Sequence, residues 1–338
     1  MEFEEKMVRK MKRMIMILLL VLLLCGCQAA PEETTPTTEP PKTVGICLPG
    51  RSAVWKPHAN KLAAALEAEG IRVRFEFGAE DVLLQQSQVQ NLLHMPVDLL
   101  VLGAYDPLTL SEYLTDIDTP VLAYDRALRL TDDIDGCVMA DYFDAGQQMV
   151  AYALEQYPEK EQITLELFMG QPQDPNAYRF YQGVMEALQP LLDSGKVVIL
   201  SERVAFEDVC LSKGELEDAR DQCFDYLARE YENTFPDVLI CGNDAMAEGC
   251  IQALEGMAFS PSESWPVVTG LGGEEDFLWL VEDGYLTVTA KVDEDAMVEA
   301  CVRWILALLE GQTPEAQQLD TGTDMIPAEL LKLHLITR

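Results

Sequence analysis

Charged and amide residues follow several short apolar runs of the sequence. They are two aspartates, an arginine and two asparagines: Asp106, Asp125, Arg126, Asn176 and Asn243. Carboxylate and amide oxygens accept hydrogen bonds, and a guanidinium donates from a rigid fork, so this set suits a ligand whose hydroxyls both donate and accept. Each has a structural alternative, since Asp125 and Arg126 can form an ion pair and Asp106 can cap the helix that follows it.

Two further positions beside these runs have two possible roles each. Asp244 precedes a helical stretch, so we expect it to cap that helix and leave Asn243 as the ligand contact. Trp55 follows the first apolar run and is either a core residue or a flat platform for the apolar face of a sugar ring.

An alternation of apolar runs and longer helical stretches, beginning at Thr43, must position these residues. The apolar runs predict strands at 44–48, 73–77, 99–102, 121–124, 164–168, 197–200, 238–241 and 267–269. The longer stretches predict helices at 56–69, 82–93, 145–156, 177–192, 216–231 and 245–256. This alternation is typical of parallel sheets with helices on both faces, and strand groups divided near Asp141 favour two doubly wound α/β domains. Ligands of such sheets bind at the carboxyl ends of the strands, where the polar residues lie.

Motifs for cofactor chemistry and nucleophilic catalysis are missing from the sequence. Neither GxGxxG nor GxxxxGK[ST] follows any predicted strand, and the glycines of 270–273 are interpreted as a turn. GxSxG is also absent, and His58, His94 and His334 are interpreted as surface or hydrogen-bonded structural residues. We therefore expect no cofactor and no catalytic residue.

The cysteines do not form a metal-binding pattern. Cys25 and Cys27 lie near the N-terminus, and the other seven are Cys47, Cys137, Cys210, Cys223, Cys241, Cys250 and Cys301. No CxxC pair and no histidine at ligand spacing accompany them, so we expect no metal site. Cys210 and Cys223 can pair, and most of the others are expected to be small buried hydrophobic residues.

The charge of the 338-residue chain is strongly negative, with 24 Lys and Arg against 58 Asp and Glu and a net charge of −34. Such a surface repels phosphate backbones, so nucleic-acid binding is excluded. The first 26 residues differ: five basic residues against three glutamates give them a charge of +2.

A secretory signal is indicated at the N-terminus. The apolar run Met14–Leu24 has a basic segment before it and extends only about 16 Å as a helix, too short for a bilayer. The sequence LCGC that ends the run resembles a bacterial lipobox, which implies a signal peptide at 1–26 and lipidation of Cys27. Residues 27–42 are rich in proline, threonine and glutamate and are predicted to be an extended tether.

From Thr43 onward the chain resembles the periplasmic sugar-binding proteins of bacterial ABC importers, most closely the multiple-monosaccharide and xylose branch. The resemblance lies in residues 163–199, 96–110, 119–128 and 264–273, which include the YDR motif at 124–126. It implies two Rossmann-like lobes joined by three hinge crossings, the type I periplasmic binding fold. The implied lobes are 43–141 plus 291–318 and 142–290 plus 319–338. It further implies a monomeric, lipid-anchored protein outside the cytoplasm that binds a monosaccharide and docks on an ABC permease.

The resemblance also assigns contacts to individual residues. It implies ligand contacts from Arg51, Ser52, Trp55, Asp106, Asp125, Arg126, Asn176, Asn243 and Lys291. The chain departs from the family pattern at Val54, where an arginine is common, at Tyr142, and at Gly272, where an aspartate is usual. Glu274 is a candidate substitute acceptor for that aspartate. These departures leave the identity of the sugar open.

Three alternatives to a transport receptor remain open in the sequence. A sensory module would present a sugar to a membrane receptor, and a degenerate pair of lobes would bind a non-sugar ligand. A secreted carbohydrate-active enzyme would use paired carboxylates as acid and base. We interpret the chain as a binding protein and not an enzyme.

Overall fold

The computed structural model describes residues 40–50, 55–114, 117–131, 133–231, 234–257, 265–320 and 325–337, together with Met7 and Met11. At 320 and 325–327 only the backbone is described. The chain divides into two compact units, residues 1–40 and 41–338, and the account below concerns the second. Cys27, Arg51, Ser52 and Val54 lie outside the described residues.

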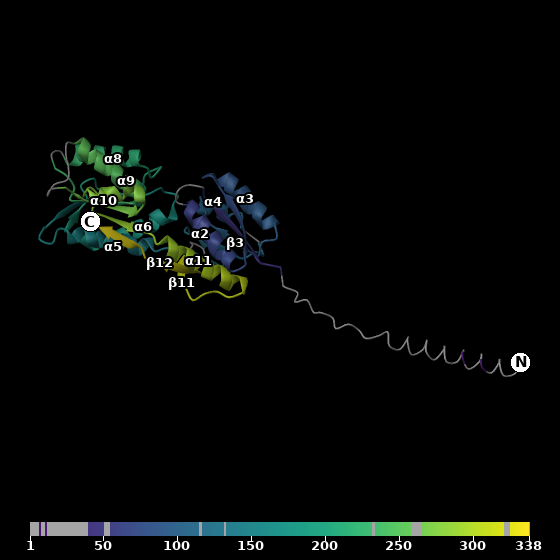
Figure 1. Cartoon of the computed structure of the whole chain (residues 1–338). Helices are drawn as coiled ribbons and strands as arrows, with labels where there is room; N and C mark the ends of the chain where they lie inside the picture. The colour runs from purple at the N-terminus through teal and green to yellow at the C-terminus, as the bar shows by residue number, and fades with distance from the viewer. Residues whose placement is uncertain are drawn as a thin grey trace. The chain divides into compact units, whose positions relative to one another are not determined.

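A seven-stranded sheet forms the first lobe of the unit (Figure 1). Its order is β11-β12-β5-β4-β3-β1-β2, and every neighbouring pair is parallel except β11 with β12. The strands are β1 (Thr43–Leu48), β2 (Arg72–Phe77), β3 (Leu99–Leu102), β4 (Val121–Tyr124), β5 (Gly136–Ala140), β11 (Gln317–Asp320) and β12 (Met325–Leu331). The helices of this lobe are α2 (Trp55–Ala68), α3 (Val82–His94), α4 (Pro107–Ser111) and α11 (Glu294–Leu309).

The side chains of β1 alternate between the two faces of this sheet, and helices bury both faces. Ile46 and Leu48 pack against α2 and α11, whereas Cys47 packs on the opposite face with α3 and α4. Successive side chains of a strand point to opposite faces, so a continuous apolar run is needed when helices cover both.

A six-stranded sheet forms the second lobe, in the order β13-β10-β9-β8-β6-β7. Its strands are β6 (Ile163–Phe168), β7 (Val197–Val198), β8 (Val238–Cys241), β9 (Val267–Gly272), β10 (Val288–Lys291) and β13 (His334–Thr337). Its helices are α5 (Tyr142–Glu155), α6 (Pro175–Asp193), α7 (Phe206–Val209), α8 (Leu216–Glu230), α9 (Asp244–Gly256) and α10 (Glu275–Glu282). Helices α5 and α6 pack on one face of this sheet, and α8 and α9 pack on the other (Figure 1).

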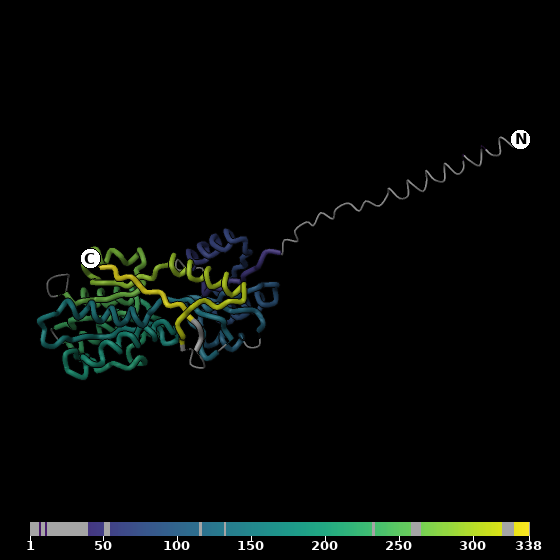
Figure 2. Tube along the Cα trace, turned by 90° about the horizontal axis from the view of Figure 1, so that it is seen from below, coloured from purple at the N-terminus to yellow at the C-terminus, as the bar shows by residue number. Residues whose placement is uncertain are grey.

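The chain crosses between the lobes three times. The crossings follow β5, β10 and β12, and the C-terminal segment, yellow in Figure 2, passes from the first sheet to the second. The predicted fold class, two doubly wound lobes with three hinge crossings, is confirmed.

The C-terminal boundary between the lobes differs from the sequence-based boundary at 319. Strand β12 pairs in parallel with β5, and β11 pairs with β12, so residues 317–331 belong to the first sheet. The chain enters the second sheet only at β13, which pairs with β10. Strands β11, β12 and β13 lack the continuous apolar runs by which strands such as β1 and β3 were predicted.

The seven cysteines of this unit are free thiols. Six are buried and Cys210 is half-buried, and the pairing of Cys210 with Cys223 that the sequence left open is not formed. The Cys223 Sγ lies instead 4.0 Å from the carbonyl oxygen of Cys250. Within the described residues, no helix combines the length and apolar character needed to span a bilayer.

Candidate ligand-binding site

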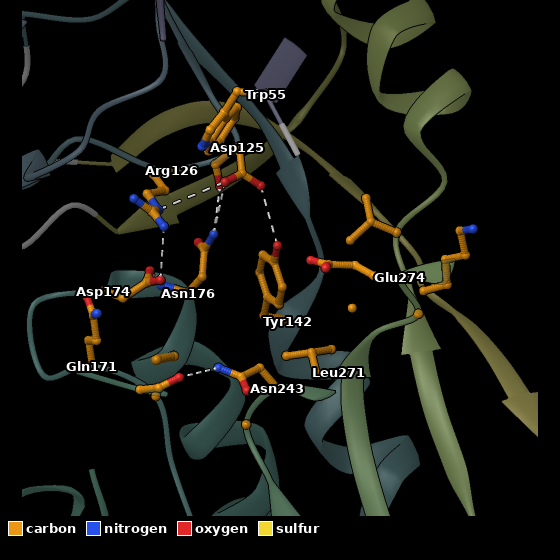
Figure 3. Close-up of a pocket in the computed structure, with 18 of the residues that line it drawn as sticks. Trp55, Asp125, Arg126, Tyr142, Gln171, Asp174, Asn176, Asn243, Leu271 and Glu274 are labelled. Carbon is orange, nitrogen blue, oxygen red and sulfur yellow. Dashed lines mark hydrogen bonds and ion pairs between the residues drawn. The ribbon is translucent and has the colours of Figure 1, made fainter. Parts of the chain in front are cut away.

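A cavity of about 780 Å³ lies between the two lobes. It is lined at the carboxyl ends of β4, β6, β8, β9 and β10 and at the first turns of helices α2, α6 and α10 (Figure 3). Parallel sheets bring the carboxyl ends of their strands to one edge, so each lobe turns its polar strand ends toward the other.

Asp125 and Arg126 form the first-lobe side of this cavity. Asp125 directly follows β4 with a left-handed backbone (φ 66°), and its Oδ1 lies 3.4 Å from the donating hydroxyl of Tyr142. The guanidinium Nε of Arg126 lies 4.0 Å from the Asp125 Oδ2. Burial raises the pKa of Asp125 to about 6, with a further rise from Asp174, although Arg126 opposes the shift.

Two direct contacts join the lobes at this side of the cavity. Arg126 donates from Nη2 to the Oδ2 of Asp174 at 3.2 Å, and Asn176 donates from Nδ2 to the carbonyl oxygen of Asp125 at 3.1 Å. Asp174 also caps α6, because its Oδ1 accepts from the backbone N–H of Asn176 at 2.9 Å. The same short segment at the start of α6 therefore begins the helix and binds the opposite lobe.

The amide oxygen of Asn176 is left without a partner. Asn176 is only 6% exposed, and its buried Oδ1 accepts no hydrogen bond within the described part of the chain. A buried acceptor without a donor is costly, and a ligand hydroxyl in the cavity can satisfy it.

Asp244 fixes the loop that closes the second-lobe side. It is 2% exposed, and it accepts from the Thr289 hydroxyl at 2.6 Å and from the Gly273 backbone N–H at 2.7 Å. Burial raises the pKa of Asp244, while these hydrogen bonds act in the opposite direction.

The comparisons with known proteins agree with this geometry. The family model of the periplasmic binding protein domain matches residues 44–313. The chain belongs to this periplasmic binding protein family.

Sequence relatives within the family cover most of the chain. It is 30% identical over 310 residues to the multiple sugar-binding periplasmic protein SbpA of Azospirillum brasilense, covering 88% of this chain and 87% of that protein. It is also 30% identical over 300 residues to the multiple sugar-binding periplasmic receptor ChvE of Rhizobium radiobacter, covering 86% and 85%. These relatives are binding proteins, and this chain is a binding protein and not an enzyme.

A solved structure is also similar over nearly the whole length. An ABC transporter solute-binding protein from Clostridium phytofermentans, with bound β-D-glucose, has a TM-score of 0.80 and 27% identity, covering 88% of this chain and 94% of that one.

Several residues predicted from the sequence line the cavity of this periplasmic binding protein. They are Trp55, Asp125, Arg126, Asn176, Asn243 and Lys291. Trp55 is 9% exposed and belongs to the first-lobe core while also lining the cavity, so its core role is confirmed and its role as a platform for a sugar ring stays a prediction.

The predicted helix cap at Asp244 is wrong, because Asn243 caps the helix, whereas the ligand contact of Asn243, which lines the cavity, stays a prediction. Asn243 caps α9, with its Oδ1 accepting from the Met246 N–H at 2.7 Å and its Nδ2 donating to the Gly214 carbonyl at 2.9 Å. Asp244 is the first residue of the helix and holds the neighbouring loop. Either side chain can cap a helix, and the sequence gives no sign that the aspartate is drawn toward Thr289.

Asp106 is a helix cap and does not line the cavity within the described residues. Its Oδ1 accepts from the backbone N–H groups of Leu108 and Thr109, and its Oδ2 accepts from the Thr109 hydroxyl at 2.8 Å. These donors from α4 show the capping role that the sequence offered as the structural alternative for this residue, and its ligand contact stays a prediction.

His58, Tyr142 and Asp174 line the cavity although the sequence interpretation assigned them no ligand contact. The Nδ1 of His58 lies 2.6 Å from the hydroxyl of Tyr124, and burial lowers the pKa of His58. A signal for His58 was present, because a spacing of three residues places it on the same face of α2 as Trp55. Within the described residues, no group of three acidic, histidine or cysteine side chains could hold a metal ion.

Proposed function

We propose that this protein binds a monosaccharide in the cavity between its lobes and delivers it to the permease of an ABC importer. The observation that carries the proposal is the pairing of the YDR segment of one lobe with the start of α6 of the other. Asp125 and Arg126 contact Asn176 and Asp174 directly across the cavity.

The chemistry of the lining residues supports a polyhydroxylated ligand. Asp125 and Asn176 offer acceptors, Arg126 and Lys291 offer donors, and Trp55 adds an aromatic surface. A ligand that contacts both lobes has greater affinity for the closed arrangement and therefore shifts the population toward it. The multiple sugar-binding relatives and the glucose-bound structure support the same ligand class.

Export and anchoring form a second part of the proposal. The basic segment and apolar run up to Leu24 support a signal peptide, and the sequence at 24–27 supports acylation of Cys27. Two or more acyl chains give stable attachment to a membrane, which keeps a monomeric receptor near its permease. Arg51 and Ser52 remain predicted ligand contacts.

A thermal-shift screen of the full-length protein tests the ligand class. The panel contains aldopentoses, aldohexoses, their phosphates, inositols and nucleosides. A ligand at a hundred times its Kd should stabilise the folded state by about 2.7 kcal/mol. We expect one or more monosaccharides to raise the Tm, and the proposal fails if none of them does so at millimolar concentration while another class does.

A further inference from the structure

Glu274 lines the cavity without a protein partner. It directly precedes α10, and its side chain extends into the cavity on the side of Tyr142 (Figure 3). Its carboxylate does not cap the helix, and it forms no ion pair or side-chain hydrogen bond with any described residue. A carboxylate in this position is available to a ligand.

The loop that carries Glu274 is held rigidly by Asp244. Gly273 donates its backbone N–H to the Asp244 Oδ2, and Gly272 has a φ of 134°, a conformation that side-chain-bearing residues rarely adopt. Thr289 fixes the other oxygen of Asp244 from β10. The carboxylate of Glu274 therefore cannot leave the cavity by movement of its backbone without breaking buried hydrogen bonds.

The charge around Glu274 is negative. Glu275 and Asp276 also line the cavity. Glu274 itself is exposed toward the cavity, and its partial desolvation together with the charges of Asp244 and Asp276 raises its pKa. Of the basic residues that line the cavity, Arg126 is paired with Asp174, and no ion pair joins Lys213 or Lys291 to Glu274 in the described structure. A cationic group on the ligand would compensate this excess of negative charge.

A second observation also calls for donors on the ligand. Asn176 is only 6% exposed, and its Oδ1 accepts no hydrogen bond from any described residue. Asn176 lines the same cavity as Glu274. An ammonium group offers three donors and no acceptor, whereas a hydroxyl offers one donor.

We propose that Glu274 binds an ammonium group on the ligand, so that the preferred ligand is an aminated monosaccharide. This inference rests on the proposed sugar-binding function and narrows its ligand class. A charge-assisted hydrogen bond is stronger than a neutral one by an amount that corresponds to about tenfold in affinity.

Titration calorimetry on three forms of the full-length protein tests the inference. The forms are the wild type, Glu274→Gln and the control Glu282→Gln, which changes an exposed glutamate of the same helix outside the cavity lining. The ligands are D-glucose and D-galactose, each compared with its 2-amino and 6-amino derivatives. We expect one amino derivative to bind the wild type and the control about tenfold more tightly than its parent sugar.

In Glu274→Gln we expect that advantage to disappear while the parent sugar keeps its affinity within about threefold. The inference is overturned if the parent sugars bind the wild type as tightly as their amino derivatives. It is also overturned if the advantage survives in Glu274→Gln. A wild type that binds no sugar of either kind contradicts the proposed function itself.

Discussion

Asp125 has a left-handed backbone conformation. Its carboxylate contacts the hydroxyl of Tyr142, the guanidinium of Arg126 and the side-chain amide of Asn176. A non-glycine residue in this region of φ costs about 1–3 kcal/mol, which the surrounding contacts must offset. The conformation turns the carboxylate away from the strand and into the cavity. We infer that the strain is retained because it presents Asp125 to the ligand.

The raised pKa of Asp125 predicts how stability depends on pH. Burial moves this pKa from its ordinary 3.8 to about 6, so between these values the folded state holds a proton that the unfolded state has lost. The stability that this group contributes is present below pH 4 and is lost as the pH rises through 6.

Urea unfolding of the wild type and of Asp125→Asn from pH 3.5 to 7.5 measures this effect. The free energy of unfolding of the wild type, minus that of the variant, should fall between about pH 4 and 6 and be constant above that range. A difference that is constant across the whole range would show that Asp125 titrates in the folded state at its ordinary pKa, and a difference that rises with pH would show that its folded-state pKa is lowered; either result contradicts the prediction.

Asp106 is an aspartate that caps a helix and does not line the cavity, in contrast to Asp125. Loss of its cap in Asp106→Ala should lower the free energy of unfolding by about 1 kcal/mol, because two backbone N–H groups of α4 lose their acceptor. The affinity for the bound sugar should stay within about twofold of the wild type. A tenfold loss of affinity in calorimetry would show that Asp106 contributes to ligand binding.

Helices α5 and α6 approach each other so closely that two glycines are required at their contact. A Cβ built at Gly183 would lie 1.9 Å from the carbonyl oxygen of Phe143, and one built at Gly146 would lie 2.3 Å from the carbonyl oxygen of Phe180. This contact fixes α6, whose N-cap Asp174 and first-turn residue Asn176 both line the cavity. Packing of the helix pair thus positions two of the residues that contact the opposite lobe.

Gly183→Ala should therefore destabilise the protein by about 2 kcal/mol or more, because the added methyl group has no space and the helices must separate. Gly256→Ala is the control, since a Cβ at the end of α9 meets no atom within 4 Å. Chemical denaturation should show no loss for the control. Equal stability of the two variants would contradict the close packing of α5 and α6.

Elements with long apolar or amphipathic runs could be predicted from the sequence, and others could not. Strands β1, β3, β4 and β8 were predicted within a residue of their bounds because helices cover both of their faces. Strands β5, β10, β11, β12 and β13 were missed; β11 and β13 are edge strands, which require no continuous apolar run, but β5, β10 and β12 lie inside their sheets. The position of Asp125 at the end of a strand was predictable, whereas the buried position of Asp244 depends on Thr289, which is 45 residues distant.

The whole chain combines a ligand-binding body with an N-terminal segment proposed to hold it at a membrane. If Cys27 is acylated, Cys27→Ser should move the protein from the membrane fraction to the soluble fraction of its host cell, because the acyl chains supply the attachment. Fractionation followed by immunoblotting measures the distribution, with Cys25→Ser as the control. Equal membrane retention of Cys27→Ser and the wild type would contradict the anchor.

The central claim is that a monosaccharide binds between the lobes through the side chains that join them. Its most direct test is titration calorimetry of the sugar that most stabilises the wild type, carried out on the wild type and on Asp125→Ala. We predict a single-site binding isotherm for the wild type and at least a tenfold loss of affinity in Asp125→Ala, which should still unfold cooperatively. Equal affinity in the two proteins would contradict the proposed site.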